Sequence, residues 1–352
     1  MTICYFGDFD PAYVRNKVIT RGLQENGVQV LFCNNRSRGI KKYFKLWKLH
    51  NQIKNKYDLL IVGYSDTRWI TVLAKLISRK DIVWDGFYSI YDSWVFDRKL
   101  VSPRSIKAGY YWFMDWLNCR LAYKILTDTD EHIKYFVNTF GVKPSKFLRV
   151  WVGADEEIFY SRQDNVEAGL VLFFGHYIPL QGVEYIVEAA KILQNQLVQV
   201  KFEIIGRGQE YKKIRALADQ LEVKIINFID ELPIENLADR MAKAVICLGI
   251  FGNTDKTLRV IPTKIYSAIA MAKPVISADT PAMRELFTDQ VNILFCHRAD
   301  PQDLAAKIQL LLDNQAIRTY IAQSAHLMYN KHLNNKAIGS YLKNHINQWL
   351  NA

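Results

Sequence analysis

Residues 244–285, AVICLGIFGNTDKTLRVIPTKIYSAIAMAKPVISADTPAMRE, decide the fold class of this chain. The apolar runs at residues 245–248 and 274–277 have the length and composition of buried strands. Between them, apolar residues recur at helical spacing, with Pro262-Thr263 as a start signal and Lys273-Pro274 as a stop. This order predicts a strand-helix-strand unit whose helix begins at the carboxyl edge of a parallel sheet, where α/β folds bind ligands.

Lys264 lies in the first turn of the predicted helix, where the helix dipole disfavours a cation by roughly 0.3–1 kcal/mol. A bound anion would reverse that cost, because free backbone N–H groups and the ammonium would both face it. Ser267 follows one turn later on the same helical face. This stretch alone leaves two interpretations open, an anion site at Lys264 or a solvated surface lysine.

The composition suits two globular domains. The chain has 352 residues and half of them are apolar, which is enough for large cores. Its five cysteines are scattered, without Cys-x-x-Cys or Cys/His clusters, so we expect neither disulfides nor a metal site. No signal-peptide pattern opens the chain, and no apolar run approaches the ~18 residues needed to span a bilayer. We therefore expect a cytoplasmic protein.

Strand and helix patterns alternate along the whole sequence. Strands are predicted at residues 2–6, 28–33, 58–63, 82–84, 124–127, 147–152, 170–174, 200–205, 223–228, 245–248, 274–277 and 292–295. Alternation of this kind implies parallel sheets with helices on both faces. The polar stretch 153–168 interrupts it and is interpreted as a linker.

The expected fold class is therefore α/β, with two doubly wound Rossmann-like domains that face a cleft. The first domain covers residues 1–152 and the second covers residues 169–337. The last helical pattern, at about residues 338–352, is a candidate to pack back onto the first domain.

Positive charge is concentrated in the first half. The net charge is +11, yet residues 1–150 alone contribute a balance of +12. Residues 36–57, RSRGIKKYFKLWKLHNQIKNKY, contain no acid, and aromatic residues alternate with the basic ones. Such a helix can lie on an anionic membrane surface. It can also pack its apolar stripe on the sheet and leave its lysines in water. No nucleic-acid-binding module accompanies it, so no nucleic acid is expected as a partner.

Five segments together resemble a known family. They are FGDFDPAYVRNKVITRGLQENGVQV (6–30), TDTDEHIKYFVNTFG (127–141), VWVGADEEIF (150–159), LFFGHYIPLQGVEYIVEAAKIL (172–193) and RVIPTKIYSAIAMAKPVISADTPAMRELF (259–287). In this order they resemble the GT-B glycosyltransferases of family 4, over nearly the whole chain. The resemblance implies transfer of a sugar from a nucleotide diphosphate donor, a UDP- or GDP-sugar, with retention. It also implies a glycan or lipid-linked acceptor and no obligatory cofactor or metal. Peripheral attachment to the inner membrane face is instead suggested by the basic segment 36–57 and the charge of residues 1–150.

The resemblance also implies site residues. Candidate donor-binding residues are Gly7, Gly175, His176, Gln181, Gly182, Gly206, Arg207, Arg259, Lys264 and Ser267. Asp85 and Asp128 each follow a predicted strand of the first domain, and we expect at least one to contact the acceptor or the reacting sugar.

The sequence also departs from the family pattern. His176 and Gln181 occupy places where the family has Arg and Lys, and the family's Glu pair falls on Arg259 and Ser267. Lys264, Arg259 or Arg207 are candidates to replace the missing phosphate ligands. The loss of both acids leaves a second interpretation, a catalytically weak or inactive glycosyltransferase-like binding subunit.

Overall fold

The computed structural model describes residues 1–162 and 165–351, and the chain divides into two compact units. The first unit comprises Met1–Gly153 and Leu333–Ala352, and the second comprises Ala154–His332. All twelve predicted strands are present in these residues, with ends that differ from the prediction by at most three positions. The predicted α/β class, with two doubly wound parallel sheets, is confirmed.

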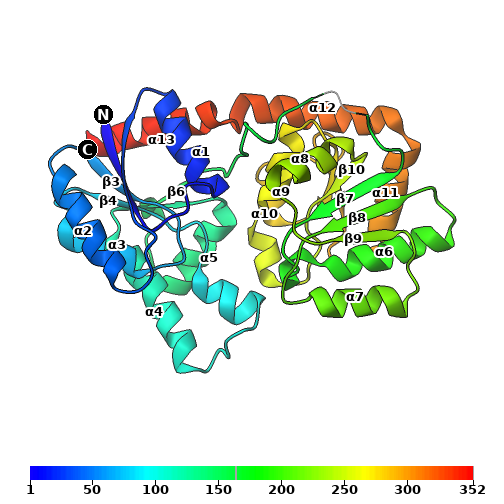
Figure 1. Cartoon of the computed structure of the whole chain (residues 1–352), viewed down its shortest axis with the longest axis horizontal. Coiled ribbons are helices and arrows are strands. Elements are labelled where there is room, and N and C mark those ends of the chain that lie inside the picture. The colour runs from blue at the N-terminus through cyan, green and yellow to red at the C-terminus, as the bar shows by residue number, and fades with distance from the viewer. Residues whose placement is uncertain (163–164, 352) are drawn as a thin grey trace. The chain divides into compact units, whose positions relative to one another are not determined.

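The first unit alternates strands with helices (Figure 1). Its elements are β1 (Thr2–Gly7), α1 (Val14–Glu25), β2 (Gln29–Asn34), α2 (Lys41–Ile53), β3 (Leu59–Val62), α3 (Trp69–Ile77), β4 (Ile82–Asp85), the π-helix η1 (Asp92–Asp97), α4 (Ile106–Leu121), β5 (Lys124–Thr127), α5 (Asp130–Phe140), η2 (Pro144–Lys146), β6 (Phe147–Arg149) and α13 (Asn335–Leu350).

The first sheet has the strand order β2-β1-β3-β4-β5-β6, and every neighbouring pair is parallel. Side chains alternate across it, so Ile3 and Tyr5 enter the core beneath α1 and α13. Cys4 and Phe6 enter the opposite core, to which α2, α3, α4 and α5 contribute. Strand order reverses between β1 and β3, which makes this point of the carboxyl edge a crevice suited to ligands.

The helices α1 and α13 lie side by side and meet at two glycines (Figure 1). A Cβ on Gly22 would lie 2.3 Å from the Asn335 carbonyl oxygen, and one on Gly339 would lie 2.0 Å from the Gly22 carbonyl carbon. Backbones approach this closely only where no side chain intervenes. The segment from Leu333 onward is therefore an integral layer of the first unit.

The second unit repeats the alternation. Its elements are β7 (Leu170–Phe174), η3 (Pro179–Gln181), α6 (Val183–Asn195), β8 (Lys201–Ile205), α7 (Tyr211–Gln220), β9 (Ile226–Ile229), α8 (Ile234–Lys243), β10 (Ile246–Leu248), η4 (Asp255–Arg259), α9 (Thr263–Ala270), β11 (Val275–Ala278), α10 (Pro281–Arg284), β12 (Leu294–Cys296), α11 (Pro301–Asp313) and α12 (Gln315–His332).

The second sheet has the order β12-β11-β10-β7-β8-β9, again all parallel. Its main core joins Val171 and Phe173 of β7 to apolar residues of α6, α7 and α11. The helix α9 contacts β10, β11 and α12. The strand order reverses between β7 and β10, so the carboxyl edge has a second candidate crevice there.

The structure differs from the prediction in several places. Residues 163 and 164 of the predicted linker 153–168 lie outside the described residues, while Asp155 and Phe159 are buried and belong to the second unit. Two helical segments, η1 and α5, had no counterpart in the prediction. The C-terminal helical pattern is broken at Leu333, where α12 ends and Asn334 caps α13.

Within the described residues, no helix combines the length and the hydropathy that crossing a membrane requires.

Candidate functional site

The crevice of the second unit is built from the turns that follow β7 and β10. Gly175 continues β7, and Gly249 continues β10. The backbone nitrogen of Phe251 donates to the Gln181 carbonyl at 3.0 Å, and that of Gly252 donates to the Leu180 carbonyl at 3.2 Å. These bonds join the two turns into one rigid edge.

Close packing at this edge requires glycine at two positions. Gly182 has φ +64°, and a Cβ there would lie 2.4 Å from the backbone nitrogen of Gly252. Gly206 has φ +131°, and a Cβ there would lie 2.2 Å from the Gly175 carbonyl oxygen. Any side chain at either position would push the turns apart.

Lys264 lies at the centre of this crevice. Its Nζ donates to the Gln181 side-chain oxygen at 2.5 Å and lies 3.5 Å from the Gly249 carbonyl oxygen. The same ammonium lies 3.5 Å from the centroid of the Phe173 ring. A Cβ added to Gly175 would lie only 3.0 Å from Nζ, so this glycine makes room for the lysine.

The lysine is an isolated buried cation. It is 5 % exposed, and burial lowers its pKa well below the ordinary lysine value of 10.5. Lys264 Nζ contacts the neutral oxygens of Gln181 and Gly249 and the ring of Phe173. No carboxylate of the described residues forms a salt bridge with it. A buried ammonium without a counter-ion is costly. The anion site proposed from the sequence would relieve that cost, whereas the solvated-lysine interpretation was wrong.

Two helices begin at the same crevice. The helix α6 starts after Gly182 and α9 starts after Pro262, and neither has a side-chain cap. Their first backbone N–H groups therefore have no intrahelical acceptor and suit an anionic ligand.

The other predicted donor-site residues lie in different environments. His176 is exposed, and Arg207 is an exposed residue that pairs with Asp230. Ser267 is 6 % exposed, and its hydroxyl donates to the Thr263 carbonyl at 3.4 Å. Arg259 ends η4, which packs against η3, the short helix that carries Gln181. The structure thus gathers Gly175, Gln181, Gly182 and Lys264, with Gly206 supporting them, and does not bring Arg207 to Lys264.

Sequence reasoning missed Gly249, Gly252 and Thr257 of this site. A Cβ on Gly252 would lie 2.3 Å from the Pro179 carbonyl oxygen, and the buried Thr257 hydroxyl donates to the Leu180 carbonyl at 3.4 Å. The pair of glycines directly after an apolar strand was a signal that could have identified the second turn.

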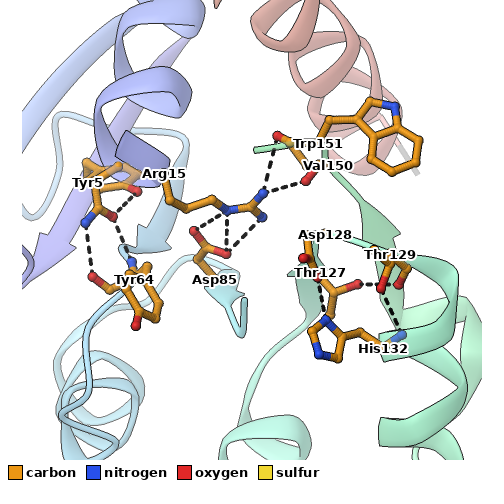
Figure 2. A network of polar contacts seen from close by, with 11 residues as sticks. Tyr5, Arg15, Tyr64, Asp85, Thr127, Asp128, Thr129, His132, Val150 and Trp151 are labelled. Atoms are coloured by element: carbon orange, nitrogen blue, oxygen red, sulfur yellow. Dashed lines mark hydrogen bonds and ion pairs between the residues drawn. The ribbon is translucent and has the colours of Figure 1, made fainter. Parts of the chain in front are cut away.

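In the first unit, Asp85 is engaged by Arg15 (Figure 2). Both side chains are fully buried, and the guanidinium donates to the carboxylate through Nη2 at 3.0 Å and through Nε at 3.1 Å. Its Nη1 donates to the Val150 carbonyl at 2.5 Å. Burial lowers the pKa of Arg15, but Asp85 together with Asp128 and Tyr5 outweighs burial, and the pKa is raised. The expectation that Asp85 contacts an acceptor is therefore corrected, since its carboxylate is occupied and has no exposed surface.

Asp128 is 1 % exposed and lies 2.5 Å from Nδ1 of His132 (Figure 2). The N-cap of α5 is Thr129 rather than Asp128, because the His132 backbone nitrogen donates to the Thr129 hydroxyl at 3.1 Å. Asp128 thus orients a buried imidazole in this structure. Gly7, at φ +142°, ends β1 beside Ile70 and directly precedes Asp8, which lines a crevice of the first unit.

That crevice has a volume of about 250 Å³ and combines carboxylates with phenol rings. Its lining residues are Asp8, Asp10, Tyr13, Arg36, Tyr64, Ser65 and Asp66. Arg36 pairs with Asp10 at 3.0 Å, and Lys42 pairs with Asp8. Carboxylates and aromatic faces suit neutral polyhydroxylated ligands, because the carboxylates accept hydroxyl hydrogen bonds and the rings cover apolar C–H faces.

Residues 155–328 match the family described as Glycosyl transferases group 1. An uncharacterized glycosyltransferase of Methanocaldococcus jannaschii is 24 % identical over 237 residues, which cover 64 % of this chain and 59 % of that protein. A D-inositol 3-phosphate glycosyltransferase of Kribbella flavida is 22 % identical over 222 residues, which cover 57 % of this chain and 51 % of that protein. The match thus spans between half and three fifths of the length of these two relatives.

Two solved structures share the fold along nearly the whole chain. Sucrose-phosphate synthase from Thermosynechococcus elongatus has a TM-score of 0.75 at 14 % identity, with 99 % of both chains covered. Anabaena HepE in complex with UDP-glucose has a TM-score of 0.72 at 14 % identity, with 99 % of this chain and 100 % of that chain covered.

Proposed function

We propose that this chain, whose residues 155–328 form a group 1 glycosyltransferase domain, transfers a sugar from a nucleotide diphosphate donor to a glycan or lipid-linked acceptor. The configuration of the sugar is retained, as the sequence resemblance implies. The reaction takes place on the cytoplasmic side, with the enzyme held peripherally at the inner membrane face.

One observation carries the proposal: the buried, uncompensated Lys264 at the sheet crevice of the second unit. A diphosphate would supply the missing negative charge, and the N-termini of α6 and α9 would add backbone donors. The same groups would stabilise the charge that develops on the leaving nucleotide diphosphate as the glycosidic bond breaks.

UDP is the first nucleotide to test, because Anabaena HepE is described in complex with UDP and with UDP-glucose. In the first unit, Asp85 acts as a positioning residue that fixes Arg15 and the carboxyl edge of the sheet. Asp128 acts as a positioning residue that orients the imidazole of His132. The crevice between Asp8 and Asp66 receives the acceptor.

Thermal denaturation with UDP, GDP, ADP, uridine and inorganic phosphate tests the donor site. A ligand at ~100 times its dissociation constant adds about 2.7 kcal/mol of unfolding free energy, a readily measured shift. We expect stabilisation by one nucleoside diphosphate and little by its nucleoside. Equal stabilisation by nucleoside and diphosphate would contradict a phosphate site at Lys264.

A second candidate function is a binding subunit without turnover. It is favoured by one observation: Arg259 and Ser267 stand where acids are expected, and the nearly buried Ser267 hydroxyl bonds to its own helix. Hydrolysis of UDP-glucose and GDP-mannose by the purified chain separates the two candidates. Donor binding without release of the nucleoside diphosphate, even with a range of acceptors, would favour the binding subunit.

A further inference from the structure

An apolar groove of about 730 Å³ lies on the first unit between α2 and α3. It is lined by Ile40, Phe44, Trp47, Trp69, Leu73 and Leu76, among others. Phe44 is 67 % exposed and Leu76 is 78 % exposed, so the groove is open to solvent. Contiguous exposed apolar side chains of this kind mark interaction surfaces.

The side of α2 opposite the groove packs on the sheet. The exposed apolar side chains of the groove therefore do not result from a helix that lacks packing partners. Leu46 and His50 are buried against the sheet, and His50 Nε2 lies 2.7 Å from the Tyr57 hydroxyl. The two interpretations of the basic segment 36–57 are thereby reconciled. One stripe of α2 packs on the sheet, and a second apolar stripe, with Phe44 and Trp47, remains exposed.

The charge around the groove is of one sign. Neither α2 nor α3 contains an acidic residue. Their exposed lysines are Lys41, Lys45, Lys48 and Lys75. An apolar slot bordered by ammonium groups is complementary to a hydrocarbon chain that carries an anionic group.

Two smaller hollows of the same unit form a series with the groove through shared lining residues. Trp69 lines both the groove and a hollow of about 260 Å³, and Asp66 lines both that hollow and the 250 Å³ crevice. Trp69 Nε1 donates to the Tyr110 hydroxyl at 2.9 Å, and the Tyr88 hydroxyl donates to Asp66 at 2.8 Å. Along these adjoining hollows, together called the track, the lining changes from apolar at Leu76 to carboxylate-containing at Asp66.

We propose that this track binds an anionic lipid-linked acceptor. Its hydrocarbon chain lies between α2 and α3, its anionic linkage lies beside the lysines of α2, and its sugar head extends past Trp69 toward Asp66. The inference rests on the proposed sugar transfer and deepens it, since it selects a lipid-linked acceptor over a free glycan. A water-soluble glycan would have no use for the apolar end of the track.

The test is sedimentation of the full chain with sucrose-loaded vesicles, of phosphatidylcholine alone or with phosphatidylglycerol. We expect binding to the anionic vesicles at low salt, and a decline as salt screens the lysines. The double variant Phe44→Ser, Leu76→Ser should bind about tenfold or more weakly, because each side chain loses apolar burial. Its matched control is Leu197→Ser, Leu327→Ser, which removes similarly exposed leucines of the second unit.

A second measurement locates the hydrocarbon chain. Decyl phosphate below its micellar concentration should raise the melting temperature of the wild type, inorganic phosphate should not, and the groove variant should lose the response. The proposal is overturned if the wild type stays in the supernatant with anionic vesicles at low salt. It is also overturned if the groove and control variants bind the anionic vesicles equally. A third contrary result is that dextran sulfate competes with the vesicles while decyl phosphate has no effect, which would indicate an acidic glycan as the ligand.

UDP binding by the wild type without vesicles keeps the two proposals separate. Vesicle and decyl phosphate binding without any nucleotide binding would leave the lipid track and refute the sugar-transfer proposal. Nucleotide binding without lipid binding would refute the lipid track and leave the sugar-transfer proposal standing.

Discussion

Replacing Lys264 by Met should lower the affinity for UDP and leave protein stability nearly unchanged. Met keeps the length of the side chain and its contact with Phe173 but removes the buried charge. If the ammonium makes one charge-assisted hydrogen bond to a diphosphate, its loss costs about 1.5–3 kcal/mol of binding free energy. At 1.4 kcal/mol per factor of ten, the dissociation constant for UDP rises about 10- to 150-fold.

The stability of the ligand-free protein should not fall with the affinity. In the Lys264→Met variant the Gln181 side-chain oxygen loses its donor, so we expect little net change in unfolding free energy. The double variant Lys264→Met, Gln181→Leu removes both polar groups and should gain about 1–2 kcal/mol. Urea denaturation measures both values.

The pH dependence follows from the lowered pKa of Lys264. Between that lowered pKa and the ordinary lysine value of 10.5, the unfolded chain binds more protons than the folded one. Wild-type stability should therefore rise with pH through this window, relative to Lys264→Met. Binding of the diphosphate requires the protonated lysine, so affinity should fall as pH rises.

Lys273→Met is a matched control, because its Nζ also donates within the second unit, to the carbonyls of Ala242 and Ala244. It should lower the unfolding free energy by about 1–3 kcal/mol and leave the affinity for UDP unchanged. Calorimetry with UDP and uridine measures the affinities. The reasoning is refuted if Lys264→Met binds UDP within threefold of the wild type, or loses uridine and UDP affinity equally.

Three further substitutions test the two sheet edges. Gly182→Ala should abolish UDP binding and destabilise the fold far more than Gly27→Ala, whose added Cβ meets nothing within 4 Å; similar melting temperatures for both would contradict the close turn packing. Asp85→Asn should lower the unfolding free energy by about 3 kcal/mol in urea, because Arg15 keeps its charge without a counter-ion, and UDP affinity should not change. Ser267→Glu should lower the melting temperature, since overpacking a 6 % exposed position costs about 1–3 kcal/mol; an unchanged melting temperature with tighter UDP binding would show instead that an acid fits there.

The periodicity of apolar residues was sufficient to predict the strands of both sheets. It was insufficient to predict the turns and side-chain contacts at their carboxyl edges. Strands with both faces buried form apolar runs, and Gly, Asn and Asp residues clearly mark where these runs end. The helix α5 was missed although its sequence has the signal: the apolar residues at positions 133, 136, 137 and 140 recur at helical spacing. Its Thr129 cap was the available start signal.

Site prediction succeeded where position along a strand dictates geometry. Gly175 and Lys264 come together because each follows from the βαβ order. It failed where a long-range partner decides the role of a side chain. Asp85 is occupied by Arg15, which lies seventy positions earlier in the chain, and no local pattern contains that information.

The two glycines that join α1 and α13 have a consequence for biosynthesis. The core beneath α1 includes Ile338, Leu342 and Ile346, so it is not complete until the last helix has left the ribosome. During translation, the second unit can form while the first still exposes part of one sheet face. The nascent chain thus passes through an interval in which that apolar face needs a chaperone or stays prone to association. A chain that ends after His332 should form a protease-resistant second unit joined to a protease-sensitive first unit.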